Sequence, residues 1–213
     1  MKAIRAVSGL VCVLCLTAGC TAATTSTSAG TAPSTTTTAP ATTTSTTTTP
    51  VSAVPRPDHV VVVIEENHSY ADVIGSAQAP YLNSLAGQGA LFTASFAVAH
   101  PSEPNYLAVF SGSTQGVGDD SCPHTFTAGS LGGQLVAAGL GFAGYSEGLP
   151  STGYTGCSAG EYARKHNPWV DFPAVPASAD LPWSAFPTDF AALPTVSFVI
   201  PNLADDMHDG TIG

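Results

Sequence analysis

Residues 59–68, with the sequence HVVVVIEENH, decide the fold of this chain. Their unbroken run of β-branched residues is typical of a strand that is buried on both faces of a parallel sheet. A second apolar run, TVSFVI over residues 195–200, predicts another such strand. Helical patterns lie between the two runs, and strands that alternate with helices predict an α/β fold. We expect a mainly parallel sheet with helices on both faces.

The chain between these two runs predicts five further elements. Helical spacing of apolar residues predicts helices over residues 80–88, 104–110 and 130–138. Gly89 is expected to close the first of them. In the middle helix the spacing directs three apolar side chains at the core: Tyr106, Leu107 and Phe110. Apolar runs of strand length predict strands over residues 91–98 and 142–146.

Polar residues follow both of the quoted strands. Glu66 and Asn67 come directly after the first, and His208 lies among aspartates after the second. Open α/β sheets bind ligands beyond the carboxyl ends of their strands, so both clusters are expected to face one cleft. Glu66 and Asn67 offer a carboxylate and an amide oxygen to a divalent cation. The alternative for such a pair is a solvated turn at a strand end.

Ser102 stands just before the expected middle helix, whose first turn contains Pro104. A serine at this place is a natural N-cap. It is also well placed to accept a phosphoryl group, because the amides at a helix N-terminus stabilise an anion. A metal or a base would have to activate its hydroxyl. His208 can bind a metal, donate to a phosphate oxygen or protonate a leaving group, and the alternative is a solvated acidic loop.

The first residues of the chain are typical of an export signal. Lys2 and Arg5 precede an apolar run over residues 6–18 that is too short for a stable membrane anchor. The run ends in LTAGC, which resembles a bacterial lipobox with Cys20 as the lipidated residue. The alternative is a plain signal peptide. We therefore expect an exported protein, either a cell-envelope lipoprotein or a secreted one.

Three segments follow from this composition. Residues 1–19 are the expected signal peptide. Residues 21–54 contain 16 Thr and no charged residue, so residues 20–54 are expected to form a disordered stalk, which is typical of O-glycosylated proteins. The folded part is expected over residues 55–213, which is enough chain for one hydrophobic core.

The charge balance excludes one large class of function. The chain has 5 Lys+Arg against 15 Asp+Glu. Loss of Lys2 and Arg5 with the signal would leave 3 basic residues, a net charge of −12. A nucleic-acid binder needs a basic surface, so no nucleic-acid partner is expected. Any chemistry directed at phosphate would need a local positive charge, most simply a metal ion.

Cysteine usage agrees with export. Cys122 and Cys157 are the two cysteines of the expected folded part. Two cysteines in an exported domain are expected to form a disulfide, and the alternative is a pair of buried thiols.

Six segments, in order along the chain, resemble one known family. They read HVVVVIEENHS from residue 59, APYLNSLA from 79, HPSEPNY from 100, CSAGEYARKH from 157, PTVSFVIPN from 194 and MHDG from 207. The set resembles the acid phosphatases and phospholipase C phosphoesterases of bacteria and fungi, within the alkaline-phosphatase-like superfamily. The resemblance implies an alkaline-phosphatase-like α/β fold and hydrolysis of a phosphate ester through a phosphoserine.

The same resemblance implies a role for several residues. Glu66, Asn67 and Ser102 match ligands of a divalent metal ion, and Ser102 also matches the nucleophile. His208 matches a histidine beside the transferred phosphoryl group. The residues that match substrate positioning are His100, Asn105 and Asp209. The basic cluster at residues 164–166 either helps to bind substrate or is a solvated helix end.

Three functions stay open at this point. The first is hydrolysis of phosphate monoesters, the acid-phosphatase type, with a phospholipid or phosphoinositide among the candidate substrates. The second is a phospholipase C that acts on diesters. The third is a non-catalytic surface lipoprotein, because members of the family continue past residue 213 with an acidic cluster, another histidine and the last strands of the sheet. The resemblance thus implies the N-terminal part of a phosphoesterase domain with an incomplete sheet. The lipobox-like sequence separately predicts contact with a membrane through the lipid anchor on Cys20.

Overall fold

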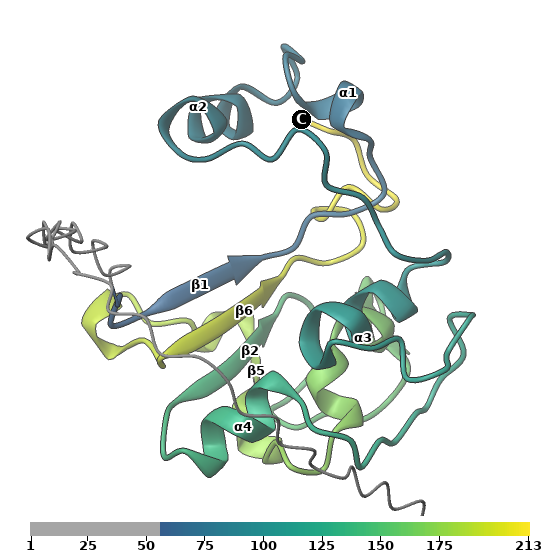
Figure 1. The fold of residues 1–213 in the computed structure, drawn as a ribbon, viewed down its shortest axis with the longest axis vertical. Helices are drawn as coiled ribbons and strands as arrows, with labels where there is room; N and C mark the ends of the chain where they lie inside the picture. Colours follow the sequence, from purple (N-terminus) through teal and green to yellow (C-terminus); the bar gives the residue numbers. More distant parts are fainter. Residues whose placement is uncertain (1–55) are drawn as a thin grey trace, which may run out of the picture. The chain divides into compact units, whose positions relative to one another are not determined.

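The computed structural model describes residues 56–213, so the expected signal, the stalk and Cys20 lie outside the described residues. Its main sheet has four parallel strands in the order β1-β6-β2-β5. The strands are β1 Val60–Val63, β6 Val196–Ile200, β2 Phe142–Ser146 and β5 Asp180–Pro182. Figure 1 shows β1 and β6 side by side, with their carboxyl ends on the same side. The predicted α/β class with a parallel sheet is confirmed.

Helices and short turns connect these strands. The α-helices are α1 Tyr70–Val73, α2 Pro80–Gln88, α3 Glu103–Ser111 and α4 Leu131–Ala137. The 3-10 turns are η1 Arg164–His166, η2 Pro168–Asp171, η3 Ala177–Ala179, η4 Trp183–Ala185 and η5 Phe190–Ala192. A small antiparallel pair consists of β3 Ser158–Ala159 and β4 Tyr162–Ala163. Within residues 56–213, none of the helices has the length and hydrophobicity that a membrane crossing requires.

The hydrophobic core lies between one face of the sheet and α3. Tyr106, Leu107 and Phe110 of α3 are buried, as their spacing predicts. Phe110 packs edge-on against Phe198 of β6, with ring centroids 5.7 Å apart. Trp169 of η2 fits against β2 because residue 144 is glycine: a Cβ there would lie 2.2 Å from two of its ring atoms. This packing fixes α3, and with it the position of Ser102 at the start of the helix.

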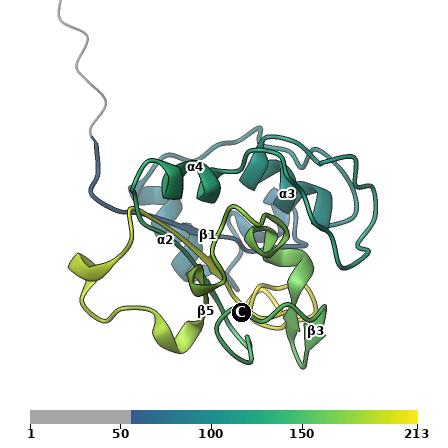
Figure 2. The ribbon, with the colours of Figure 1, turned by 90° about the horizontal axis from the view of Figure 1, so that it is seen from below.

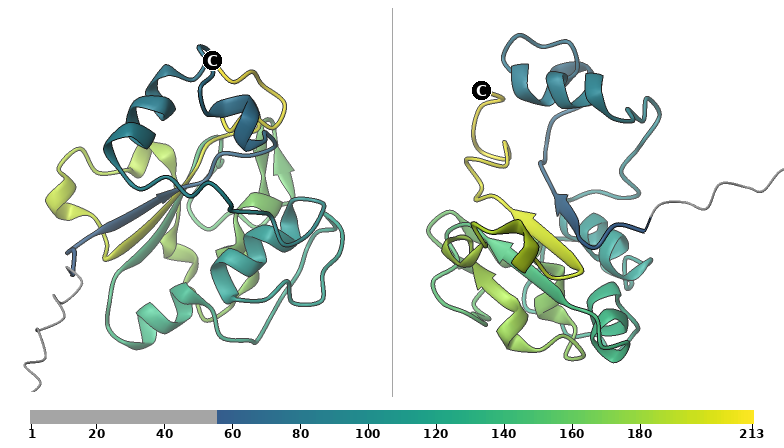
Figure 3. Two further views of the ribbon diagram at one scale, coloured as in Figure 1. Left: turned by 45° about the horizontal axis from the view of Figure 1, so that its top comes forward. Right: turned by 90° about the vertical axis from the view of Figure 1, so that its left-hand side faces the viewer.

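The second face of the sheet is covered by 3-10 turns instead of α-helices. Tyr145 of β2 points to that face and packs against Phe186, with ring centroids 5.0 Å apart. Figures 2 and 3 show α3 and α4 on one side of the sheet and the segment with η4 and η5 on the other. Within residues 56–213, helical segments therefore lie on both faces, with α3 and α4 on one and 3-10 turns on the other.

The environment of β1 differs from the prediction. The valine run was expected to be buried on both faces, but β1 lies at the edge of the sheet and pairs only with β6. Val60, Val61 and Val63 are 40%, 42% and 53% exposed. The apolar run determines the strand itself, whereas burial on both faces requires packed layers above and below the sheet. At this edge of the sheet the described residues leave much of β1 uncovered.

The prediction of a strand over residues 91–98 is wrong. These residues are mostly irregular, with a turn at residues 93–94 and a bend at Val98, and Phe92 and Phe96 are 78% and 84% exposed. At the end of the segment the backbone amides of Val98 and Ala99 donate to Asn105 Oδ1, at 2.9 and 3.0 Å. A side chain of α3 thus satisfies donors that a neighbouring strand would otherwise satisfy.

The expected disulfide is present. Cys122 and Cys157 are bonded, with Cα atoms 5.9 Å apart. The bond ties the loop that follows α3 to the start of β3. Closing a long loop in this way stabilises the fold, on the chain-entropy account, by lowering the entropy of the unfolded chain.

Candidate active site

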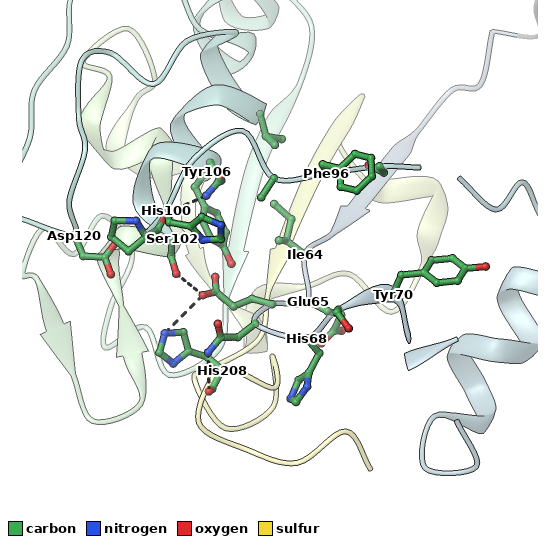
Figure 4. Close-up of a pocket in the computed structure, with 18 of the residues that line it drawn as sticks. Ile64, Glu65, His68, Tyr70, Phe96, His100, Ser102, Tyr106, Asp120 and His208 are labelled. Carbon is green, nitrogen blue, oxygen red and sulfur yellow. Dashed lines mark hydrogen bonds and ion pairs between the residues drawn. The ribbon is translucent and has the colours of Figure 1, made fainter. Parts of the chain in front are cut away.

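A cavity of about 1060 Å³ opens beyond the carboxyl end of β1, beside the N-terminus of α3. Figure 4 shows Ser102 and His208 approaching it from different segments of the chain. Its polar side includes Glu65, Glu66, Asn67, Ser102, Asp120 and His208. The two polar clusters that follow the apolar strands therefore face one cleft, as the sheet topology predicts.

Ser102 occupies the N-cap position of α3 but does not cap the helix. Its hydroxyl makes no bond to a helix amide and donates instead to Glu66 Oε1. Asp120 takes over capping, since its Oδ1 accepts from the amide of Glu103 at 3.0 Å. The interpretation of Ser102 as an ordinary N-cap is thus wrong, and its hydroxyl is directed at a carboxylate.

Glu66 lies where β1 leaves the sheet. The amide of Glu66 donates to the carbonyl of Asp206 at 2.8 Å, which joins the segments that follow the two apolar strands. Burial tends to raise the pKa of Glu66, but the imidazole of His166 and the hydroxyl of Ser102 outweigh it and lower this pKa to about 2. The carboxylate is therefore ionised throughout the ordinary pH range.

His166 is a site residue that the sequence did not single out. It lies in η1, is 1% exposed and stacks on Tyr106 with ring centroids 4.6 Å apart. Its Nε2 is 3.1 Å from Glu66 Oε2, and its Nδ1 is 3.1 Å from Asp206 Oδ2. Burial lowers the pKa of His166, but the two carboxylates outweigh this effect and raise it. In the sequence His166 was noted only as part of the basic cluster 164–166 and as the last residue of the segment CSAGEYARKH, which carries the family resemblance.

His208 completes the group around Glu66. Its Nε2 lies 3.6 Å from Glu66 Oε1, and its Nδ1 lies 2.7 Å from Asp209 Oδ1. The Nζ of Lys165 is 3.3 Å from the same Nε2. Because an ammonium only donates, Nε2 is the acceptor and Nδ1 carries the proton that is donated to Asp209. Asp209 is 59% exposed and orients His208; it does not line the cavity.

Asn67 reaches the site through an unusual backbone conformation. Its φ of 64° is in the left-handed region, which asparagine tolerates better than most residues. Its side-chain amide donates to the carbonyl of His208 at 3.4 Å. Asn67 therefore links the two loops that carry the site.

His100 and Asn105 differ in whether their polar atoms are available to bind a substrate. His100 is exposed and lines the cavity. Asn105 also lines it, but its Nδ2 donates to the carbonyls of Ala99 and Pro101, both at 2.9 Å, while its Oδ1 accepts two amides. All four of its hydrogen-bonding positions are thus occupied within the chain, so Asn105 shapes the loop that precedes Ser102.

The residues present fit a divalent metal ion. Glu66, His166 and His208 each offer one ligand atom, and these atoms lie within 4.8 Å of one another. The Nε2 of His166 is buried and makes no aligned hydrogen bond among the described residues. Its distance of 3.1 Å to Glu66 Oε2 matches the roughly 3 Å between neighbouring ligands of one ion. Asp206 and Asp209 contact the other ring nitrogens, an arrangement common behind metal-binding histidines.

Comparisons of the sequence with a family model and with known proteins point to the same family. The sequence model of the phosphoesterase family matches residues 76–213. A phosphatidylinositol-3-phosphatase of Mycobacterium tuberculosis is 54% identical over 164 residues, which cover 76% of this chain and 55% of that protein. An acid phosphatase of Aspergillus fumigatus is 32% identical over 162 residues, which cover 69% of this chain and 36% of that protein. The chain thus spans about half, or less, of the length of these relatives. No solved structure matches it.

Proposed function

The chain belongs to the phosphoesterase family, and from that premise we propose that it hydrolyses phosphate monoesters with Ser102 as the nucleophile. The observation that carries the proposal is the hydroxyl of Ser102. It stands at the N-terminus of a helix, is not used as a cap, and is bonded to a carboxylate beside two histidines. An ordinary structural serine at this position would cap the helix.

In the proposed reaction Ser102 Oγ attacks the phosphorus atom, in line with the bond to the leaving oxygen. The Ser102 proton moves toward Glu66 Oε1, which already accepts its hydrogen bond. The bond from phosphorus to the leaving oxygen breaks, and this oxygen takes up the proton that Ser102 passed to Glu66. The alcohol departs and phosphoserine remains. Water then attacks the phosphoserine and releases inorganic phosphate.

Other side chains of the site would bind the metal ion or orient its ligands. Glu66, His166 and His208 would hold a divalent ion, which would polarise a phosphoryl oxygen and favour the ionised form of Ser102. Asp206 holds the ring of His166 from behind, and Asp209 does the same for His208. The first amides of α3 are used within the chain: that of Glu103 donates to Asp120 Oδ1, Pro104 has none, and that of Asn105 donates to the carbonyl of Ser102.

The cavity also supports a proposal for the substrate class. Its other side is lined by apolar residues that include Ile64, Phe96 and Val109. A phosphate ester with an apolar portion, such as a phosphoinositide, fits a cavity of this mixed character. The name of the mycobacterial relative, a phosphatidylinositol-3-phosphatase, also favours this class.

We expect chelation to abolish the activity. The rate at which the chain hydrolyses a chromogenic phosphate monoester should fall at least about a hundredfold on treatment with EDTA. The reason is that removal of the metal would remove several kcal/mol of charge stabilisation. Restoring single divalent ions would then identify the metal. A chromogenic phosphodiester measured in parallel tests the phospholipase C alternative. Activity that survives full chelation would contradict the metal-assisted mechanism, and no hydrolysis at all would favour a non-catalytic surface protein.

We also propose that the protein is exported and anchored through Cys20, on the basis of the lipobox-like sequence at residues 16–20. Cys20→Ser removes the thiol that would carry the lipid. The variant is expected to leave the membrane fraction for the medium or to stay unprocessed, as followed by fractionation and mass spectrometry of the N-terminus. Membrane partitioning and processing equal to those of the parent would overturn the proposal.

A further inference from the structure

Three Lys and Arg side chains occur in the described part of the chain, and they have different surroundings. Arg164 is buried and fully engaged: it binds Asp171 at 2.6 Å and the carbonyl of Thr155 at 2.6 Å. Arg56 is exposed and precedes β1, at the end of the strand opposite the cavity. Lys165 is the remaining one, and its ammonium lies at the site.

The short turn η1 explains why neighbouring residues reach such different places. In a 3-10 turn three residues complete one revolution, so three successive side chains point in three directions. Arg164 points to Asp171, Lys165 to Asp120, and His166 to Glu66. The basic cluster of the sequence is therefore neither a solvated helix end nor a single binding patch.

Two residues that line the cavity hold the Lys165 ammonium. Its Nζ is 2.9 Å from Asp120 Oδ2 and 3.3 Å from His208 Nε2. An ammonium has three N–H donors. Asp120 takes one, and His208 Nε2 takes a second only while its single lone pair is not bound to a metal ion, so at least one donor remains free. Lys165 does not itself line the cavity, but its side chain is 19% exposed, so these contacts do not enclose it fully.

Asp120 couples the ammonium to the proposed nucleophile. Its Oδ2 binds Lys165, while its Oδ1 accepts from the amide of Glu103, the residue that follows Ser102. One carboxylate thus fixes both the ammonium and the start of α3. The relative position of Nζ and Ser102 is set by this bridge.

Binding of a phosphate in this cavity is favoured by a cation close to Asp120. The polar side of the cavity carries the carboxylates of Glu65, Glu66 and Asp120, and a phosphate monoester is itself an anion. Like charges that share one cavity repel each other, and they repel more strongly where water is partly excluded. The proposed metal at Glu66 offsets part of this repulsion, and a second cation on the Asp120 side would offset more.

We propose that Lys165 is a phosphate-binding residue of this site and that it donates a hydrogen bond to a peripheral oxygen of the phosphoryl group. The inference rests on the proposed function, because it takes the region beside Ser102 as the place of the phosphoryl group. It adds a binding residue that neither the strand ends nor the start of α3 supply.

The test is binding of inorganic phosphate to the chain by titration calorimetry, at fixed ionic strength and with a constant concentration of divalent metal. Lys165→Met removes the charge and keeps the length of the side chain. Phosphate affinity is expected to fall by about ten- to a hundredfold, the effect of losing one hydrogen bond from a charged group. Lys165→Gln, which keeps a donor for Asp120, is expected to show a similar loss, and Lys165→Arg should recover most of the affinity.

Arg56→Met is the matched control, since it makes the same change in net charge away from the cavity. Its phosphate affinity is expected to stay within about twofold of the parent, because exposed charges at this range are screened. Circular dichroism establishes that each variant is folded, and Lys165→Gln decides the question if Lys165→Met is not. Equal affinities in the Lys165 and Arg56 variants, or no phosphate binding by the parent, would overturn the inference.

Binding and turnover separate this inference from the proposed function. A chain that binds phosphate through Lys165 but hydrolyses no ester contradicts the proposed function alone. A chain that hydrolyses esters through Ser102, with phosphate affinity unchanged in Lys165→Met, contradicts the role of Lys165 alone.

Discussion

Ser102→Ala is expected to lower the turnover of a chromogenic phosphate monoester by at least about a thousandfold, the order of loss when a catalytic unit loses its nucleophile. The substitution removes the oxygen that would form the phosphoserine. Glu66, His166 and His208 stay in place, so binding of a divalent metal should be nearly unchanged. Loss of turnover with retained metal binding is the signature that distinguishes a nucleophile from a structural residue.

The matched control for this variant is Ser84→Ala. Ser84 is an exposed serine of α2 whose hydroxyl accepts from Gln88, outside the residues that line the cavity. Its variant should keep the turnover of the parent. Because Ser102 does not cap α3, its replacement should also cost the fold little beyond one hydrogen bond, about 1 kcal/mol. Near-full activity of Ser102→Ala would refute the proposed mechanism.

Glu66→Gln is expected to have the second largest effect, a loss of turnover of about a hundred- to a thousandfold together with weaker metal binding. The amide has almost the shape of the carboxylate but no negative charge, which a divalent ion requires from its ligands. It also presents a donor in place of one of the oxygens that face Ser102 and His166. Metal content after equilibrium dialysis, measured beside turnover, shows whether the two losses occur together.

Glu161→Gln provides the comparison for Glu66→Gln, since Glu161 is an exposed glutamate that does not line the cavity. Its metal content and turnover should match those of the parent. If Glu66→Gln binds metal as tightly as the parent, Glu66 is not a ligand. Its part would then be limited to the hydrogen bond with Ser102.

Regular patterns in the sequence predicted the long elements well. The strand over residues 142–146 and the helix over residues 80–88 have the predicted bounds. The 3-10 turns and β5 could not be found in this way, because three or four residues are too few to show a period. The strand expected over 91–98 failed for another reason: apolar residues favour a strand, but a strand also needs a partner.

The sequence predicted some residues of the site but not the contacts of others. Ser102, Glu66 and His208 come together because the carboxyl ends of parallel strands meet at one edge of the sheet. His166 and Asp206 could not be predicted as partners, since their contact depends on where the short turn η1 packs against the loop after β6. Long-range contacts of this kind leave no period or spacing in the sequence.

The most direct test of the account is to trap the covalent intermediate. The chain is mixed with a phosphate monoester, the reaction is stopped with acid during turnover, and the modified peptide is mapped by mass spectrometry. We expect one phosphoryl group, on Ser102, in the parent and none in Ser102→Ala. A phosphoryl group on any other residue, or turnover without a phosphorylated chain, would contradict the proposal that Ser102 is the nucleophile.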